Sequence, residues 1–166
     1  MSESAQELRV PAVRFERTLP GPIEHVWEHL TRCENLPGWY GPTGIIEPRD
    51  GGAVNFAGGH IRGVVTQWRP CWRLAHTWNV FETGETHSAY PESYLTVDLA
   101  HDGEDIRLIL THLPILERFE KQNAMGWHTF LDILEATVRG EQAEDRRIYM
   151  QKNAKLYGVD LEHLER

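Results

Sequence analysis

Two histidines in apolar, strand-like segments are the residues best suited to chemistry in this sequence. His76 lies within residues 74–81, and His112 lies within residues 106–113. Side chains alternate between the two faces of a strand, and this alternation puts each histidine on the same face as large apolar neighbours. Both imidazoles are therefore expected to point inward. A buried imidazole without a hydrogen-bond partner costs about 1–3 kcal/mol. Each is therefore a satisfied structural histidine, a polar anchor for a ligand or a general base.

A second histidine group has the spacing of a zinc-protease signature. His25, Glu28 and His29 match H-x-x-E-H, which places both histidines on one face of a helix. However, Val26 and Leu30 define the buried face, and a 3.6-residue period puts the motif on the opposite face. A zinc protease also needs a third ligand and an open cleft. We therefore interpret the motif as a solvated helix face and expect neither a metal nor a cofactor.

The hydrophobic periodicity predicts the elements that position these residues. Strands are expected at 13–18, 45–46, 53–56, 61–68, 74–81, 93–100 and 106–113, and helices at 23–31 and 116–139. Residues 36–40 are expected to form a broken helix or turn, and residues 81–91 a polar loop near a cavity mouth. Antiparallel strands with helices at the two ends of the run define an α+β architecture rather than a βαβ fold.

Composition limits the number of domains and the kinds of partner. A chain of 166 residues suits one domain, expected to span residues 1–140, with residues 141–166 as a helical extension packed on it or on a second subunit. With 17 basic and 25 acidic residues the net charge is −8, which argues against nucleic acid and anionic membranes as partners. No apolar run reaches the ~20 residues that span a bilayer, and no secretory signal is visible. We therefore expect no membrane insertion and a cytoplasmic location.

Several short motifs occur in an order that resembles a known superfamily. They are Pro22 to Thr31, Trp39-Tyr40-Gly41-Pro42, Asp50 to Val54, Thr77-Trp78 and Gly126-Trp127. Together they resemble the START-like superfamily (SRPBCC), and within it the family of homologues of the heat-shock-protein-90 ATPase activator. The resemblance implies a helix-grip fold, in which a curved antiparallel sheet of about six or seven strands wraps a long C-terminal helix, with two short helices after the first strand. It also implies a cavity for apolar ligands.

The resemblance indicates which residues would line such a cavity. Large aromatic side chains fill cores and also line pockets, so Trp39, Trp78 and Trp127 have both interpretations. Gly126 also has two interpretations. A glycine in the middle of a helix costs about 1 kcal/mol relative to alanine, and it allows either close packing of the helix on the sheet or room for a ligand. The residues expected to contact a ligand are Trp39, Tyr40, Phe56, His76, Trp78, Leu95, Val97, Leu110, His112, Trp127 and Phe130.

Three functions from different classes are compatible with these observations. The leading one is a carrier or sensor that holds a small hydrophobic molecule, lipid-like or aromatic and polyketide-like. The resembled fold forms a cavity, and the sequence contains no Ser-His-Asp order, G-x-S-x-G elbow, P-loop or G-x-G-x-x-G. The second is a cyclase or hydratase that uses His76 or His112 as acid or base. The third is a co-chaperone-like protein interaction, although the eukaryotic co-chaperone has an additional large N-terminal domain for which 166 residues leave no room. The sequence also leaves open a homodimer formed through residues 141–166.

Overall fold

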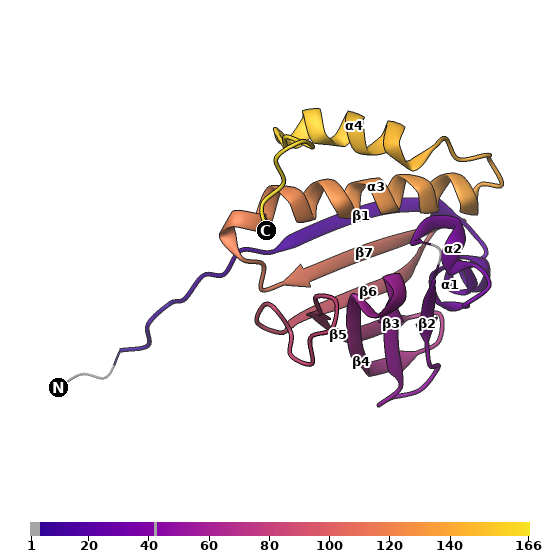
Figure 1. Ribbon diagram of the computed structural model, residues 1–166. Coiled ribbons are helices and arrows are strands. Elements are labelled where there is room, and N and C mark those ends of the chain that lie inside the picture. The colour runs from indigo at the N-terminus through magenta and orange to yellow at the C-terminus, as the bar shows by residue number, and fades with distance from the viewer. Residues whose placement is uncertain (1–3, 42) are drawn as a thin grey trace.

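The computed structural model describes residues 4–41 and 43–166, and its elements follow the predicted order (Figure 1). The strands are β1 (Val13–Pro20), β2 (Gly44–Ile46), β3 (Ala53–Phe56), β4 (Ile61–Arg69), β5 (Arg73–Val80), β6 (Ser93–Asp102) and β7 (Asp105–Leu113). The helices are α1 (Ile23–Thr31), α2 (Leu36–Trp39), α3 (Glu120–Val138) and α4 (Arg146–Tyr157), with 3₁₀ turns η1 (Ala57–Gly59) and η2 (Glu117–Phe119). The predicted α+β helix-grip fold is confirmed.

The strands form one seven-stranded antiparallel sheet in the order β1-β7-β6-β5-β4-β3-β2. From β2 to β7 each strand pairs with its neighbour in sequence, and β1 then pairs with β7, with Val13 opposite His112. The turn between β6 and β7 contains Gly103, whose φ of +63° suits glycine because it has no Cβ. The sheet curls so that its concave face receives α3 (Figure 1).

Helix α3 fills the concave face of the sheet with large apolar side chains. Trp127, Leu131, Leu134 and Val138 are spaced three or four residues apart, as one helix face requires, and all four belong to the central core. The helix begins at Glu120, later than predicted, because the residues that follow β7 first form the 3₁₀ turn η2. Within the described residues, no helix has the length and apolar character needed to cross a bilayer.

Helix α4 lies on the far side of α3, so that the helices form two layers over the sheet (Figure 1). The Asp145 carboxylate caps its first turn by accepting a backbone N–H at 2.8 Å, and Gly158 ends it with a φ of +68°. Between the two helices, the fully buried Asn153 amide donates to Thr129 Oγ1 at 3.2 Å and to Asp132 Oδ2 at 3.1 Å. A buried polar joint therefore fixes α4 on α3.

Asp132 is the acceptor that joins β1, α3 and α4. The Arg17 guanidinium of β1 donates to Asp132 Oδ1 at 2.9 Å, while Asn153 of α4 donates to Oδ2. The Asp132 side chain is only 12% exposed and that of Arg17 only 21% exposed. The Arg17 guanidinium also lies 3.8 Å from Glu135 Oε2, so removing Asp132 leaves it only this longer contact in surroundings with little access to water, which is more costly than losing an exposed pair.

We predict that Asp132→Ala lowers the free energy of unfolding by about 2–4 kcal/mol, because two donors lose their acceptor. Urea denaturation measures the change. The control is Arg49→Ala, which breaks an exposed ion pair with Glu47 at 2.9 Å and should cost about 0.5 kcal/mol or less. Equal losses for the two variants would contradict the role given to Asp132.

Candidate ligand-binding site

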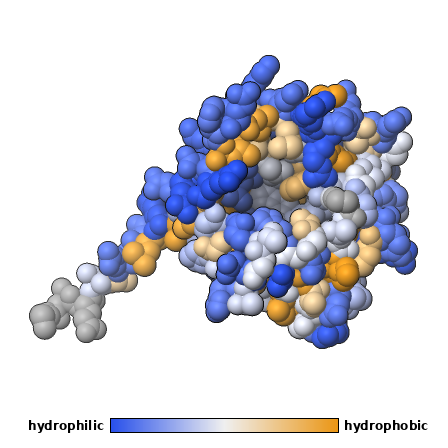
Figure 2. All heavy atoms as spheres, viewed as in Figure 1, coloured by the Kyte–Doolittle hydropathy of each residue, from blue (hydrophilic) through white to orange (hydrophobic). Residues whose placement is uncertain are grey.

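Within the described residues, a large hollow opens beside η2 and the β5–β6 connection, and a small one lies between the sheet and α3. The larger, here called the mouth pocket, has a volume of about 390 Å³, and the smaller, here called the inner void, has a volume of about 20 Å³. Figure 2 shows a recess on this side of the molecule, between the helices and the strands below them. The mouth pocket is lined by His60, Trp78, Val80, Glu82, Tyr90, Pro91, Ser93, His112, Pro114, Ile115, Leu116, Phe119, Asn123, Glu165 and Arg166.

Most of the residues predicted to contact a ligand surround the inner void rather than the mouth pocket. They are Trp39, Tyr40, Phe56, His76, Leu95, Val97, Leu110 and Trp127. Their rings pack on one another: Tyr40 lies 4.2 Å from Phe56 and stacks at 4.9 Å on Phe130, which lines neither hollow. A void of about 20 Å³ has room for about one water molecule. In this structure the aromatic set fills the deep interior.

Two of the predicted residues, Trp78 and His112, line the mouth pocket. Their rings are 5.0 Å apart and form its floor together with Ser93, which is 6% exposed. Sequence reasoning missed Ser93, although a signal was available. Alternation along β6 puts Ser93 on the same face as the buried Leu95 and Val97, and the register places it opposite Trp78.

A chain of side-chain hydrogen bonds crosses the floor of the mouth pocket. The Trp127 indole Nε1–H of α3 donates to His112 Nδ1 at 3.0 Å, and His112 Nε2 lies 2.8 Å from Ser93 Oγ. His76 forms a separate bond, with its Nδ1 2.8 Å from the Thr77 carbonyl oxygen. A carbonyl oxygen only accepts, so this nitrogen carries the proton of neutral His76.

Both buried histidines are uncharged at neutral pH. Burial lowers the pKa of His76 to about 4, partly opposed by the hydrogen bond to Thr77. Burial also lowers the pKa of His112 to about 4, and the nearby His76 adds to this effect because two positive charges would repel. The site therefore offers neutral hydrogen-bonding groups in apolar surroundings.

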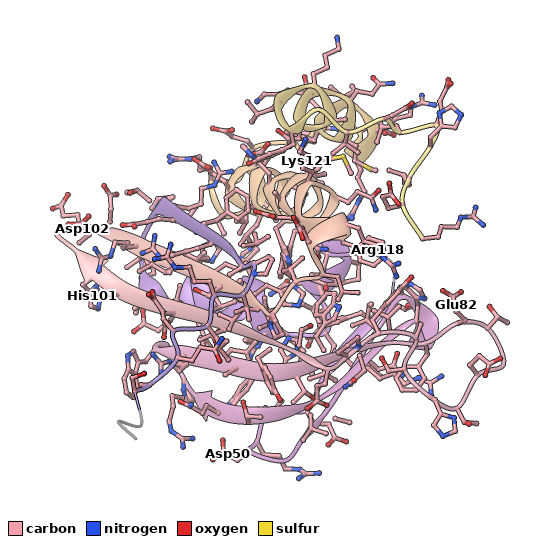
Figure 3. The ribbon with its side chains drawn as sticks, turned by 90° about the vertical axis from the view of Figure 1, so that its left-hand side faces the viewer. Asp50, Glu82, His101, Asp102, Arg118 and Lys121 are labelled. Atoms are coloured by element: carbon pink, nitrogen blue, oxygen red, sulfur yellow. The ribbon has the colours of Figure 1, made fainter. Side chains whose placement is uncertain are left out.

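Aromatic and charged side chains border the entrance of the mouth pocket. Tyr90, on the connection between β5 and β6, meets Phe119 of η2 edge to face at 5.0 Å. Arg118 lies over both rings, 5.8 Å from that of Tyr90 and 4.7 Å from that of Phe119. Figure 3 shows Arg118 on η2 and Glu82 on the β5–β6 connection, the two elements that flank the entrance. The predicted polar loop thus borders the pocket.

The sequence from residue 20 to residue 139 matches the family model described as Activator of Hsp90 ATPase homolog 1-like protein. The chain belongs to this family. The match covers the elements from the end of β1 to the end of α3, and it confirms the resemblance seen in the short motifs.

Solved structures share the fold of this chain at low sequence identity. CalU16 from Micromonospora echinospora superimposes with a TM-score of 0.70 at 20% identity, covering 89% of this chain and 86% of that chain. An HSP90 activator from Plasmodium falciparum gives 0.64 at 18% identity, covering 80% and 99%. The Aha1 dimer from Colwellia psychrerythraea gives 0.66 at 16% identity, covering 80% and 98%. A search of curated proteins finds no match.

Helix α4 lies beyond the family match yet contacts the site. Arg146 donates to the carbonyl oxygens of Trp39 at 3.0 Å and Tyr40 at 3.2 Å, and its guanidinium lies 4.7 Å from the centre of the Phe130 ring. Burial raises the pKa of Tyr40 well above its usual value, and within residues 4–41 and 43–166 its hydroxyl has no hydrogen-bond partner. In this family member, α4 therefore holds α2 and the Tyr40 ring against the inner void.

The H-x-x-E-H motif lies on α1, away from both hollows. His25 and Glu28 are exposed, and the rings of His25 and His29 meet edge to face at 4.3 Å. His29 Nδ1 lies 2.9 Å from the His25 carbonyl oxygen, four residues back. In the part of the chain that the structure describes, no group of three His, Cys, Asp or Glu side chains is arranged to hold a metal ion.

Close packing does not explain the mid-helix Gly126. A Cβ added there would meet no atom within 4 Å. We predict that Gly126→Ala raises the free energy of unfolding by about 0.5–1 kcal/mol in urea denaturation, because alanine loses less backbone entropy in a helix. A loss of stability would instead indicate that a contact of the backbone requires glycine.

Stability should fall in acid because the unfolded chain binds protons more readily than the folded one. His76 and His112 each have a folded-state pKa of about 4, against 6.5 when unperturbed. The stability that these neutral histidines contribute is therefore complete above about pH 6.5 and is lost as the pH falls towards about 4. Over this range the free energy of unfolding changes by up to about 1.4 kcal/mol per pH unit for each histidine.

Unfolding free energies are measured between pH 4.5 and 7.5. We predict that His76→Gln lowers their slope against pH by up to about 1.4 kcal/mol per pH unit, the contribution of one protonation. An unchanged slope in His76→Gln would show that His76 does not resist protonation in the folded protein.

Proposed function

We propose that this protein binds a small hydrophobic molecule, lipid-like or aromatic, in the mouth pocket and acts as its carrier or sensor. The observation that carries the proposal is the pocket itself, because about 390 Å³ falls within the ~300–1,000 Å³ of ordinary ligand sites. Its wall combines the apolar side chains of Trp78, Ile115 and Phe119 with charged residues such as Glu82 and Arg166, and the neutral groups of Ser93 and His112 meet at its floor. Small-molecule sites pair apolar surface with polar groups that orient the ligand.

A cyclase or hydratase with a cavity histidine is the alternative. His112 reaches the mouth pocket, whereas His76 lines the inner void. A general base works best when its pKa lies near the operating pH, and the pKa of His112 is about 4. Its Nδ1 is also occupied by Trp127. These properties favour binding over catalysis.

Protein interaction and self-association are secondary proposals. The family description and the HSP90 activator from Plasmodium falciparum suggest the first, and the Aha1 dimer from Colwellia psychrerythraea suggests the second. On this chain, the exposed Leu156 and Leu164 offer apolar surface that a second copy would cover. The net charge of −8 makes nucleic acid an unfavourable partner, and a cytoplasmic location is proposed from the sequence alone. Neither secondary proposal explains the presence of the mouth pocket.

The uncharged fluorescent probe N-phenyl-1-naphthylamine tests ligand binding. We predict that its fluorescence rises with wild-type protein, and that Val80→Trp, which fills the mouth pocket, weakens binding by about tenfold or more because the overlap must be relieved. Val64→Trp is the matched control, since Val64 is also a strand valine but is 48% exposed. Equal affinities for wild type and both variants would place the probe elsewhere and contradict the proposal.

A further inference from the structure

The direction of the hydrogen bonds at the pocket floor is fixed by the indole of Trp127. An indole N–H can only donate, so His112 Nδ1, at 3.0 Å, must be the acceptor. A neutral imidazole with an accepting Nδ1 carries its proton on Nε2. His112 therefore donates through Nε2 to Ser93 Oγ, at 2.8 Å. In this arrangement the histidine does not remove the proton of Ser93.

The Ser93 hydroxyl can consequently donate a hydrogen bond to a ligand. Ser93 Oγ already accepts from His112, so its own O–H must donate. Among residues 4–41 and 43–166, the acceptor found for it is the Trp78 carbonyl oxygen at 3.5 Å, beyond the usual 2.5–3.0 Å for such a bond. Ser93 also lines the mouth pocket. An oxygen atom of a bound molecule would be a better partner.

The geometry points to a ligand class: apolar or aromatic molecules that carry a hydrogen-bond acceptor, such as the oxygen of a ketone or ester, which Ser93 Oγ–H recognises at the floor of the mouth pocket. This inference rests on the proposed function and deepens it. Trp127 acts as a positioning residue, because its indole sets the histidine tautomer that leaves the serine as a donor. A molecule with the same shape but no acceptor would leave that donor without a partner.

A matched pair of probes tests the preference through displacement of N-phenyl-1-naphthylamine. We expect Ser93→Ala to weaken binding of 2-acetylnaphthalene about 3- to 10-fold and to leave binding of 2-isopropylnaphthalene, which has a similar shape but no oxygen, nearly unchanged. Ser93→Thr retains a hydroxyl and should bind both probes as wild type does. Equal changes for the two probes, or no change for either, overturn the inference and leave the proposed function standing. Failure of N-phenyl-1-naphthylamine and of both probes to bind wild type overturns both.

The tautomer can be tested without any ligand. A two-bond ¹H–¹⁵N NMR spectrum distinguishes protonated from unprotonated ring nitrogens. At pH 7 we expect the His112 ring to be protonated at Nε2 and unprotonated at Nδ1, and we expect Trp127→Phe to remove this bias because it removes the donor to Nδ1. A wild-type His112 protonated at Nδ1 would overturn the inference, whatever the probes do.

Discussion

The hydrogen bond from the Trp127 indole to His112 ties the long helix to the centre of the sheet. His112 lies on β7 between Val13 of β1 and Leu95 of β6, where it is 1% exposed. A buried imidazole that lost its partners would cost about 1–3 kcal/mol, so α3 must hold Trp127 directly beside it. The same constraint sets the floor of the mouth pocket, because His112 in turn bonds Ser93.

The fold was largely predictable because its signals are local. Alternation along the strands, the helical stripe of α3 and the order of short motifs were enough to indicate an α+β helix-grip fold. Helix α1 has the predicted limits, but the long helix begins later than predicted, since the residues after β7 first form the 3₁₀ turn η2. The inward direction of His76 and His112 also followed from counting by two, and both are buried.

The distribution of empty space was predictable only at the polar loop of residues 81–91, which borders the mouth pocket as expected; the rest depends on how side chains from distant segments pack. Tyr40, Phe56 and Phe130 are far apart in sequence, yet their rings meet and leave only about 20 Å³ in the interior. The volume lies instead towards η2 and the β5–β6 connection, and these segments have no clear periodicity. The partners of His112 were likewise hidden, since side-chain hydrogen bonds between elements have no signature in one sequence. Arg146, on a helix beyond the family match, bonds the carbonyl oxygens of Trp39 and Tyr40, and the sequence contains no pattern that would indicate this contact.

Locating a bound molecule tests the central claim most directly. Isotope-filtered NMR on labelled protein with N-phenyl-1-naphthylamine would report which protons the probe contacts. The account predicts contacts to Trp78, Ile115 and Phe119, which line the mouth pocket, while the rings around the inner void stay in place. Contacts confined to exposed apolar residues such as Trp72 or Leu156, outside the pocket, would contradict it.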